Sequence, residues 1–233
     1  MDRCTQKADY TGFEQRRVKA KMEDKFRGIG ISCTIEQAAA PQPETAEMRF
    51  DPSGTLTLLV GTTPHGQGHE TMFAQMVSGW LGLQMSDVRV FQGDTDKTLF
   101  GRGTFAQRSM STGGSALKVA ADQVIAKGKR LSAWMLEASE EDIDFEGGMF
   151  RVAGTDRAVS FREVAAKSYL GGGLPSEFGV GLDGVGSHDG TYTFPNGCMI
   201  CEVEVDTETG HIKIDRLFAI DYVGAVVNPL TLE

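Results

Sequence analysis

The feature that most constrains this chain is an abrupt change of apolar period around the segment GTTPHGQGHETMFAQ, residues 61–75. Before it, Leu56, Leu58 and Val60 alternate with other residues, which predicts a strand with one apolar face. After it, the apolar residues follow a helical spacing: Met72, Phe73, Met76, Val77, Trp80 and Leu81. The chain therefore passes from strand to helix through the glycine-rich residues 66–68, where glycine permits another group to approach the backbone closely.

The rest of the chain divides in the same way into alternating and helical segments. The predicted elements, in chain order, are a lead-in helix (9–25), a strand (27–37), a hairpin (46–61) turning at 51–54, the helix from 70, a strand (82–92), a long helix (117–135), a hairpin (141–152), a helix (160–168) capped by Ser160 with Glu163, a long loop (170–195) and two strands (198–224) around a turn at 207–210. This order predicts an α+β fold with a mixed or antiparallel sheet and packed helices. We divide the chain into a lead-in helix, residues 1–27, and part of one larger domain, residues 28–233.

Composition excludes several classes of protein. The 233 residues, 40% of them apolar, suffice for a core. The apolar runs are too short to span a membrane, and the polar opening MDRCTQKADY differs from a secretory leader, so we expect a cytoplasmic protein. A net charge of −9 argues against a nucleic-acid partner, because phosphate backbones attract basic surfaces. The negative net charge does not exclude a small anionic ligand, which needs only a local cluster of donors.

The cysteines and histidines do not form a recognisable metal or disulfide pattern. The four cysteines are too scattered for a disulfide framework, and Cys198 and Cys201 on one predicted strand would direct their thiols to opposite faces, which favours a buried structural role. His65 and His69 are separated by two glycines that disfavour a helix, and no third ligand lies nearby, so we expect no metal site.

A second polar segment, GRGTFAQRSMSTGGSA, residues 101–116, precedes the long helix. It combines glycines, hydroxyls and two arginines: Gly101, Gly103, Gly113 and Gly114; Thr104, Ser109, Ser111, Thr112 and Ser115; Arg102 and Arg108. Backbone amides, hydroxyls and a guanidinium at a helix start are the groups that bind a pyrophosphate. A solvated loop would explain the polarity but not the two arginines in an acidic protein.

Neighbouring motifs are weaker. The spacing from Gly101 to Ala106 matches a dinucleotide fingerprint, but the intervening GDTDKTLF separates it from the preceding strand, so we reject a Rossmann fold. Asp94 and Asp96 fit an acid/base pair or simple loop caps equally well. The turn at residues 66–68 fits either a phosphate or anionic cofactor edge at a helix start or a plain connection.

Taken together, three stretches resemble the molybdenum hydroxylases, the xanthine dehydrogenase and aldehyde oxidase family, and most of all large subunits of the carbon monoxide dehydrogenase type. The stretches are GTTPHGQGHETMFAQMVSGWLG, VRVFQGDTDKTLFGRGTFAQRSMSTGGSA and CMICEVEVDTETGHIKIDRLFAIDYVGAVVNP. Their order and spacing agree over nearly the whole chain, which is more specific than any single motif. The resemblance implies that residues 28–233 are part of the molybdopterin-binding domain, truncated at both ends relative to the family. Leu232 and Glu233 are either native or vector-derived.

The resemblance also implies a cofactor, molybdopterin with molybdenum, in bacterial enzymes usually as the cytosine dinucleotide. Residues on the first segment would lie against the pterin and the molybdenum ligands: Gly66, Gln67, Gly68 and His69. Residues on the second would hold the phosphates and border the substrate pocket: Thr104, Phe105, Ala106, Gln107, Arg108 and Ser109. We expect neither a direct metal ligand nor a catalytic residue in this chain, because the general-base glutamate of the family lies beyond residue 233.

The resemblance implies that this chain is the cofactor-binding portion of an oxidoreductase. The portion by itself would be inactive. Its partners would be the remainder of the large subunit, 2Fe–2S and FAD domains or subunits, and a small-molecule substrate, whether carbon monoxide, an aldehyde, a purine or another N-heterocycle. Two alternatives from other classes are a stand-alone anion- or nucleotide-binding module without redox activity, and a docking domain whose glycine loops only meet a partner.

Overall fold

The computed structural model describes residues 1–170 and 173–231, so the question of the origin of Leu232 and Glu233 lies outside the described residues. The chain packs as two units. The terminal-strand unit is Met1–Ala38 with Thr193–Val226, and the central unit is Ala39–Tyr192 with Val227–Glu233. The division at residue 27 into a lead-in helix and one domain stays a prediction.

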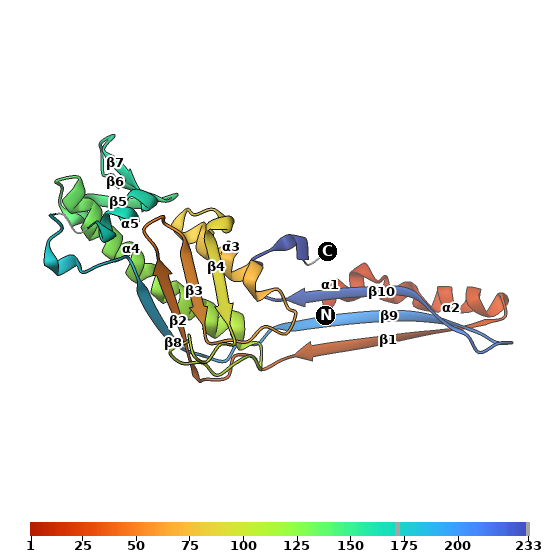
Figure 1. The fold of residues 1–233 in the computed structure, drawn as a ribbon. Helices are drawn as coiled ribbons and strands as arrows, with labels where there is room; N and C mark the ends of the chain where they lie inside the picture. The colour runs from red at the N-terminus through yellow and green to blue at the C-terminus, as the bar shows by residue number, and fades with distance from the viewer. Residues whose placement is uncertain (171–172, 232–233) are drawn as a thin grey trace. The chain divides into compact units, whose positions relative to one another are not determined.

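The central unit is built on a four-stranded mixed sheet. Its strands are β2 (Pro43–Phe50), β3 (Leu56–Val60), β4 (Val88–Gln92) and β8 (Gly184–Asp189), in the order β4-β3-β2-β8 (Figure 1). β3 and β4 are parallel, whereas the β2–β3 hairpin and the β2–β8 pair are antiparallel. The predicted mixed sheet and hairpin are thereby confirmed.

Two helices bury the apolar face of this sheet. On α3 (His69–Leu81) the residues Phe73, Val77 and Leu81 are fully buried, and on β3 Leu56, Leu58 and Val60 are fully buried. Helix α4 (Ser115–Met135) packs on β2 and β8. Burial of each such side chain contributes roughly 1.5–3 kcal/mol, so the two apolar patterns read from the sequence define this core.

A small sheet and a fifth helix complete the central unit. Strands β5 (Ile143–Glu146), β6 (Met149–Val152) and β7 (Ala158–Ser160) lie in the order β5-β6-β7 and lead into α5 (Phe161–Tyr169). The predicted cap is present: Glu163 N donates to Ser160 Oγ over 3.2 Å, and Ser160 N donates to Glu163 Oε2 over 2.7 Å. Single-turn helices lie at Tyr10–Gly12, Met85–Asp87, Glu140–Asp142, Ser176–Phe178 and Pro229–Thr231.

The prediction of a long loop over residues 170–195 is wrong at Gly184–Asp189, where the chain forms β8. The two buried positions of this strand are Gly184 and Gly186. A Cβ on Gly186 would lie 2.0 Å from the carbonyl oxygen of Ala116 on α4, and one on Gly184 would lie 2.7 Å from that of Ala120. Because α4 approaches the strand backbone so closely, the inward residues are glycine and the apolar alternation is absent.

The terminal-strand unit is an antiparallel sheet with two helices. Its strands β1 (Lys25–Ile35), β9 (Asn196–Asp206) and β10 (Ile212–Tyr222) lie in the order β1-β9-β10, which confirms the two predicted closing strands. Helix α1 (Asp2–Lys7) packs on β9 and β10, and α2 (Phe13–Met22) packs on β1. Helix α2 is shorter than the predicted 9–25, because Asp24 adopts a left-handed φ of 54° and β1 starts at Lys25.

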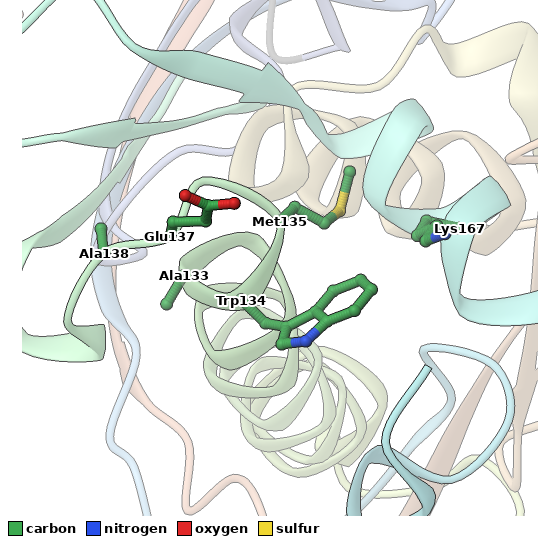
Figure 2. A pocket seen from close by; sticks show the side chains of 6 residues that line it. All are labelled: Ala133, Trp134, Met135, Glu137, Ala138 and Lys167. Carbon is green, nitrogen blue, oxygen red and sulfur yellow. The ribbon is translucent and has the colours of Figure 1, made fainter. Parts of the chain in front are cut away.

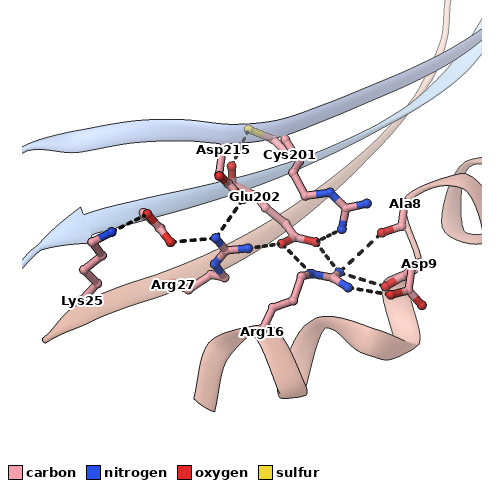
Figure 3. A network of polar contacts seen from close by, with 10 residues as sticks. Ala8, Asp9, Arg16, Lys25, Arg27, Cys201, Glu202 and Asp215 are labelled. Atoms are coloured by element: carbon pink, nitrogen blue, oxygen red, sulfur yellow. Dashed lines mark hydrogen bonds and ion pairs between the residues drawn. The ribbon is translucent and has the colours of Figure 1, made fainter. Parts of the chain in front are cut away.

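A buried carboxylate joins α2 to this sheet (Figure 3). The side chain of Glu202 on β9 is fully buried and pairs with Arg16 of α2 at 2.5 Å, Arg27 of β1 at 3.1 Å and Arg216 of β10 at 3.4 Å. Burial acts to raise the pKa of Glu202, but the hydrogen bond from Arg16 and the charges of the three arginines outweigh it and lower that pKa. The carboxylate is therefore held ionised inside the unit.

The cysteines lie where the alternation places them. Cys198 is buried and its carbonyl oxygen accepts a hydrogen bond from Cys4 Sγ at 3.3 Å, while Cys201 is half-buried on the other face of β9. All four cysteines are free thiols. Within the described ranges, no three His, Cys, Asp or Glu side chains gather as a metal site, and no helix has both the length and the apolarity to cross a membrane.

Candidate functional site

The structure brings the two glycine-rich segments together at one edge of the central sheet. β3 and β4 are parallel neighbours, so the segments that follow them, residues 61–68 and 93–109, leave the sheet at the same edge. Gly103 N donates to Gly61 O over 3.2 Å, and Thr63 N donates to Thr104 Oγ1 over 3.0 Å. Ligands of sheets with parallel strands commonly bind in the crevice at the carboxyl ends of the strands, so this edge is the candidate site.

The glycines of the two segments serve different purposes. A Cβ on Gly61 would lie 2.5 Å from Gly101 Cα, so these two glycines allow the segments to touch. Gly66 and Gly68 have φ values of +96° and +76°, and no atom of the chain lies within 4 Å of an added Cβ at either. The turn therefore needs these two glycines for its left-handed backbone, and the space beside them is open.

The turn leads directly into the amino terminus of α3. Gly68 is the N-cap residue, and no side chain caps the helix. Gln67 is exposed, and its Oε1 accepts a hydrogen bond from the backbone N–H of His65. An uncapped helix start presents backbone N–H donors and the positive end of the helix dipole, which favours an anionic group.

His69 lies inward and connects the ends of the two strands. Its buried ring places Nδ1 2.9 Å from Oε1 of Gln92, which also accepts a hydrogen bond of 2.9 Å from Thr62 Oγ1. The other amide atom, Nε2 of Gln92, is buried and lacks a hydrogen-bond partner among the described residues. Buried polar atoms are rarely left unpaired, so this nitrogen is a donor available to a bound acceptor.

The second segment contains unusual backbone. Ala106 and Gln107 are consecutive non-glycine residues with left-handed φ values of 46° and 52°, and a π-helix, Ser109–Gly114, follows before α4. Each non-glycine residue held in a left-handed conformation costs roughly 1–3 kcal/mol, and such residues cluster at functional sites. Short π-helical turns are also frequent at functional sites. Ala39 N donates to Ala106 O over 2.7 Å and fixes the strained turn, which leaves Phe105 and Gln107 exposed.

Arg108, by contrast, is fully buried below this turn. Its Nη1 donates to Glu44 Oε2 and, over 3.0 Å, to Gly103 O. Its Nη2 donates to Gln42 O at 3.1 Å and Pro43 O at 3.0 Å, while Nε is buried without a partner among the described residues. Four of the five guanidinium donors are thus used within the chain. Contact between Arg108 and a cofactor stays a prediction.

Glu44 is a residue of the candidate site that the sequence did not reveal, as is Gln92. It is fully buried, and its carboxylate also accepts hydrogen bonds from Thr45 N at 3.2 Å and Arg102 N at 3.4 Å. Glu44 occupies an inward position of β2, in register with the buried Ala46 and Met48. A carboxylate at an inward position of an alternating strand was the available signal, because such a charge requires a buried partner.

A pocket of ≈ 350 Å³ opens between these segments. Its lining residues are Gly61, Thr63, Gly93, Asp94, Thr95, Thr98, Leu99, Phe100, Gly101 and Gly103. Asp94 serves as a loop cap here: its Oδ1 accepts from Asp96 N at 3.1 Å, and its pKa is lowered chiefly by a hydrogen bond from Lys97.

A larger pocket of ≈ 610 Å³ lies at the end of α4 (Figure 2). It is lined by Ala133, Trp134, Met135, Glu137, Ala138 and Lys167. The Lys167 ammonium stands 5.4 Å from the centre of the Trp134 ring, so its cation is already partnered. We assign the site to the sheet edge that carries the smaller pocket, because the strained turn and the uncapped helix start belong to the segments that leave the sheet at this edge.

Comparison with known proteins identifies the family of this chain. Residues 3–233 match the model of the molybdopterin cofactor-binding domain. The chain is 34% identical to the carbon monoxide dehydrogenase large chain of Afipia carboxidovorans, over 97% of this chain and 30% of the relative. It is 30% identical to the nicotine 6-hydroxylase large subunit of Paenarthrobacter nicotinovorans, over 100% of this chain and 30% of the relative.

A solved structure has the same fold. Quinoline 2-oxidoreductase from Pseudomonas putida 86 superimposes with a TM-score of 0.89 at 29% identity, over 99% of this chain and 31% of that one. The chain therefore spans about 30% of the length of these relatives. It belongs to the molybdopterin cofactor-binding domain family of the molybdenum hydroxylases.

Proposed function

We propose that the edge of the sheet formed by the two glycine-rich segments binds molybdopterin. The observation that carries the proposal is the convergence of an uncapped, positive-φ helix start with a strained left-handed turn, beside a buried amide donor that lacks a partner. Such a site offers N–H donors to an anionic, hydrogen-bond-accepting guest, and a pterin phosphate is of that kind. The residues present therefore fit the group.

The side chains divide between contact and support. Gln67 and the backbone of Gly66 and Gly68 would contact the pterin edge, with His69 holding that turn against the sheet through Gln92. The backbone of Ala106 and Gln107 would contact the phosphates.

Beneath the turn, Arg108 is held by Glu44 and Gly103, and Ser109 Oγ lies 2.8 Å from Thr104 Oγ1. Thr104, Arg108 and Ser109 would therefore support the phosphate-binding backbone. Arg108 would reach the cofactor itself only through Nε, which has no partner among the described residues. Phe105, exposed beside the turn, would border the substrate pocket.

The bound cofactor would supply the two-electron redox chemistry of molybdenum for oxidation of a small molecule. We infer a cytosine dinucleotide form, a cytoplasmic location, and electron transfer through 2Fe–2S and FAD groups on other domains or subunits, together with the remainder of the large subunit. Residues 28–233 would form part of the cofactor-binding domain. Support for the redox role and for further subunits comes from two relatives, whose names are carbon monoxide dehydrogenase large chain and nicotine 6-hydroxylase large subunit.

The test uses the complete large subunit, purified with its partner subunits from a host that supplies the cofactor. Molybdenum and acid-released cytidine nucleotide are measured per mole of protein, for the wild type and for Gln67→Ala. We expect near-stoichiometric amounts in the wild type and a clear loss in the variant. A matched control is Gln84→Ala, a glutamine that precedes the single-turn helix Met85–Asp87, at the other end of α3 from the turn. A wild type without molybdenum would refute the proposal.

A further inference from the structure

One face of the terminal-strand sheet is covered by α1 and α2, and the other carries a continuous apolar surface. The cross-strand register aligns four rows on this second face: Phe26–Val205–Ile212, Gly28–Val203–Ile214, Gly30–Cys201–Leu217 and Ser32–Met199–Ala219. None of these positions holds a charged residue. The larger side chains are exposed, with 63% for Phe26, Ile212 and Ile214 and 62% for Leu217. We name these four rows the apolar face.

The glycines of this face are a second, independent observation. Gly28 and Gly30 lie within β1 without a left-handed φ, so the backbone does not require glycine there. An added Cβ on Gly30 would meet no atom of the chain within 4 Å, and one on Gly28 only an ordinary contact of 3.6 Å. Glycine weakens a strand, and in a strand interior it often marks a bulge, a tight bend or the close approach of another backbone or ligand. The register of β1 against β9 is unbroken from Lys25 to Ile35, so no bulge accounts for these two glycines.

The covered face by itself supplies little core. The buried cluster of the unit consists of Cys4, Ala8, Cys198 and Ile200, with Ile29, Phe218 and Ile220 partly buried against it. A small sheet needs a substantial apolar face packed against something to be stable. A cover over the apolar face would therefore add apolar burial that α1 and α2 do not supply.

We propose that this cover is polypeptide of the same large subunit, outside residues 1–233, which packs over the strip at Gly28 and Gly30. The chain spans about 30% of the length of its relatives, so most of such a subunit lies outside the matched segment. A face without charges resembles a domain core cut in half, as in permanent interfaces. A covalently joined segment is present whenever the unit folds, which a second copy or another subunit is not.

The first test places the photo-cross-linker p-benzoylphenylalanine at Leu217 in the complete large subunit. The expected product has the mass of one subunit, and its cross-linked peptide lies outside residues 1–233. A product at twice the subunit mass would assign the face to a second copy, and one containing another subunit would assign it to that partner. A cross-linked peptide within residues 39–192 would assign the face to the central unit of this chain. Each of these three results overturns the proposal. The matched control is the same cross-linker at Val18, exposed on α2, where we expect at most a tenth of the yield. Equal yields also overturn it.

The second test measures a change in melting temperature that has opposite signs for a covered and an uncovered face, and it needs no cofactor. Gly30→Val in the complete subunit adds a β-branched side chain at a strand position that is open in the present structure. On an uncovered face the variant raises the melting temperature, because valine favours a strand over glycine. Under a close cover it lowers the melting temperature by several degrees, which is the expected result. A higher or unchanged melting temperature overturns this proposal. The molybdenum content tests the proposed function separately.

Discussion

Arg108 and Glu44 form a fully buried ion pair that joins the strained turn of the second glycine segment to the first residues of β2. Arg108 adds hydrogen bonds to Gly103, Gln42 and Pro43, so one side chain connects three stretches of backbone. Arg108 therefore contributes a buried ion pair to the site in this structure, and not a free cation.

Glu44→Ala is expected to reduce the free energy of unfolding by roughly 3–5 kcal/mol, because it leaves the Arg108 charge buried without its partner. Urea denaturation measures the loss. Replacing both residues by methionine should recover part of that stability, since no buried charge remains while the carbonyls of Gly103, Gln42 and Pro43 lose their donor. The control is Arg49→Ala, which removes an exposed pair with Glu47 and should change stability by about 1 kcal/mol or less. A small effect of Glu44→Ala would contradict the assignment.

Gly66→Ala is expected to weaken cofactor retention with a modest effect on stability. Its φ of +96° disfavours any residue with a Cβ, at a cost of roughly 1–2 kcal/mol. Gly101→Ala is expected to be more destabilising, because its Cβ would lie 2.3 Å from Gly61 O. Thermal unfolding and molybdenum content of the complete subunit separate the two effects. Equal thermal losses in the two variants would contradict this division of roles.

Glu202→Gln is expected to change how stability depends on pH. The folded-state pKa of Glu202 lies below its ordinary value of 4.5, so its contribution is fully present above about pH 4.5 and is lost as the pH falls through the folded-state pKa. The variant should be less stable at pH 7, by roughly 3 kcal/mol for a broken buried network, and should lose less between pH 5 and pH 3. Urea denaturation across this range measures both. The exposed Glu208→Gln should retain the wild-type profile.

Gly186→Val is expected to disrupt the packing of β8 against α4, because even a Cβ there would lie 2.0 Å from Ala116 O and 2.6 Å from Ala120 N. Overpacking of this kind costs roughly 1–3 kcal/mol or more. The adjacent Val185 is 43% exposed on the same strand, so Val185→Thr is a control with a small expected effect. Melting temperatures of the two variants give the comparison, and similar values would be inconsistent with the close contact.

The sequence by itself determined the elements whose burial has a regular period: the β2–β3 hairpin, the stripe of α3, the long α4, the capping box of α5 and the closing strands. It also located the two glycine-rich segments, because glycine and hydroxyl residues at a helix start are a local signal. Whether Gly66 to His69 and Thr104 to Ser109 contact a cofactor stays a prediction.

Only the tertiary structure decided which groups meet. β8 was missed because its inward residues are glycines, selected by the approach of α4 and not by burial of their own side chains. Glu44 and Arg108 are 64 positions apart, and their pairing depends on the placement of β2 beside the turn. The same holds for Gly61 against Gly101. Contacts between distant segments follow from packing in three dimensions, whereas a periodic pattern reports only the face of a single element.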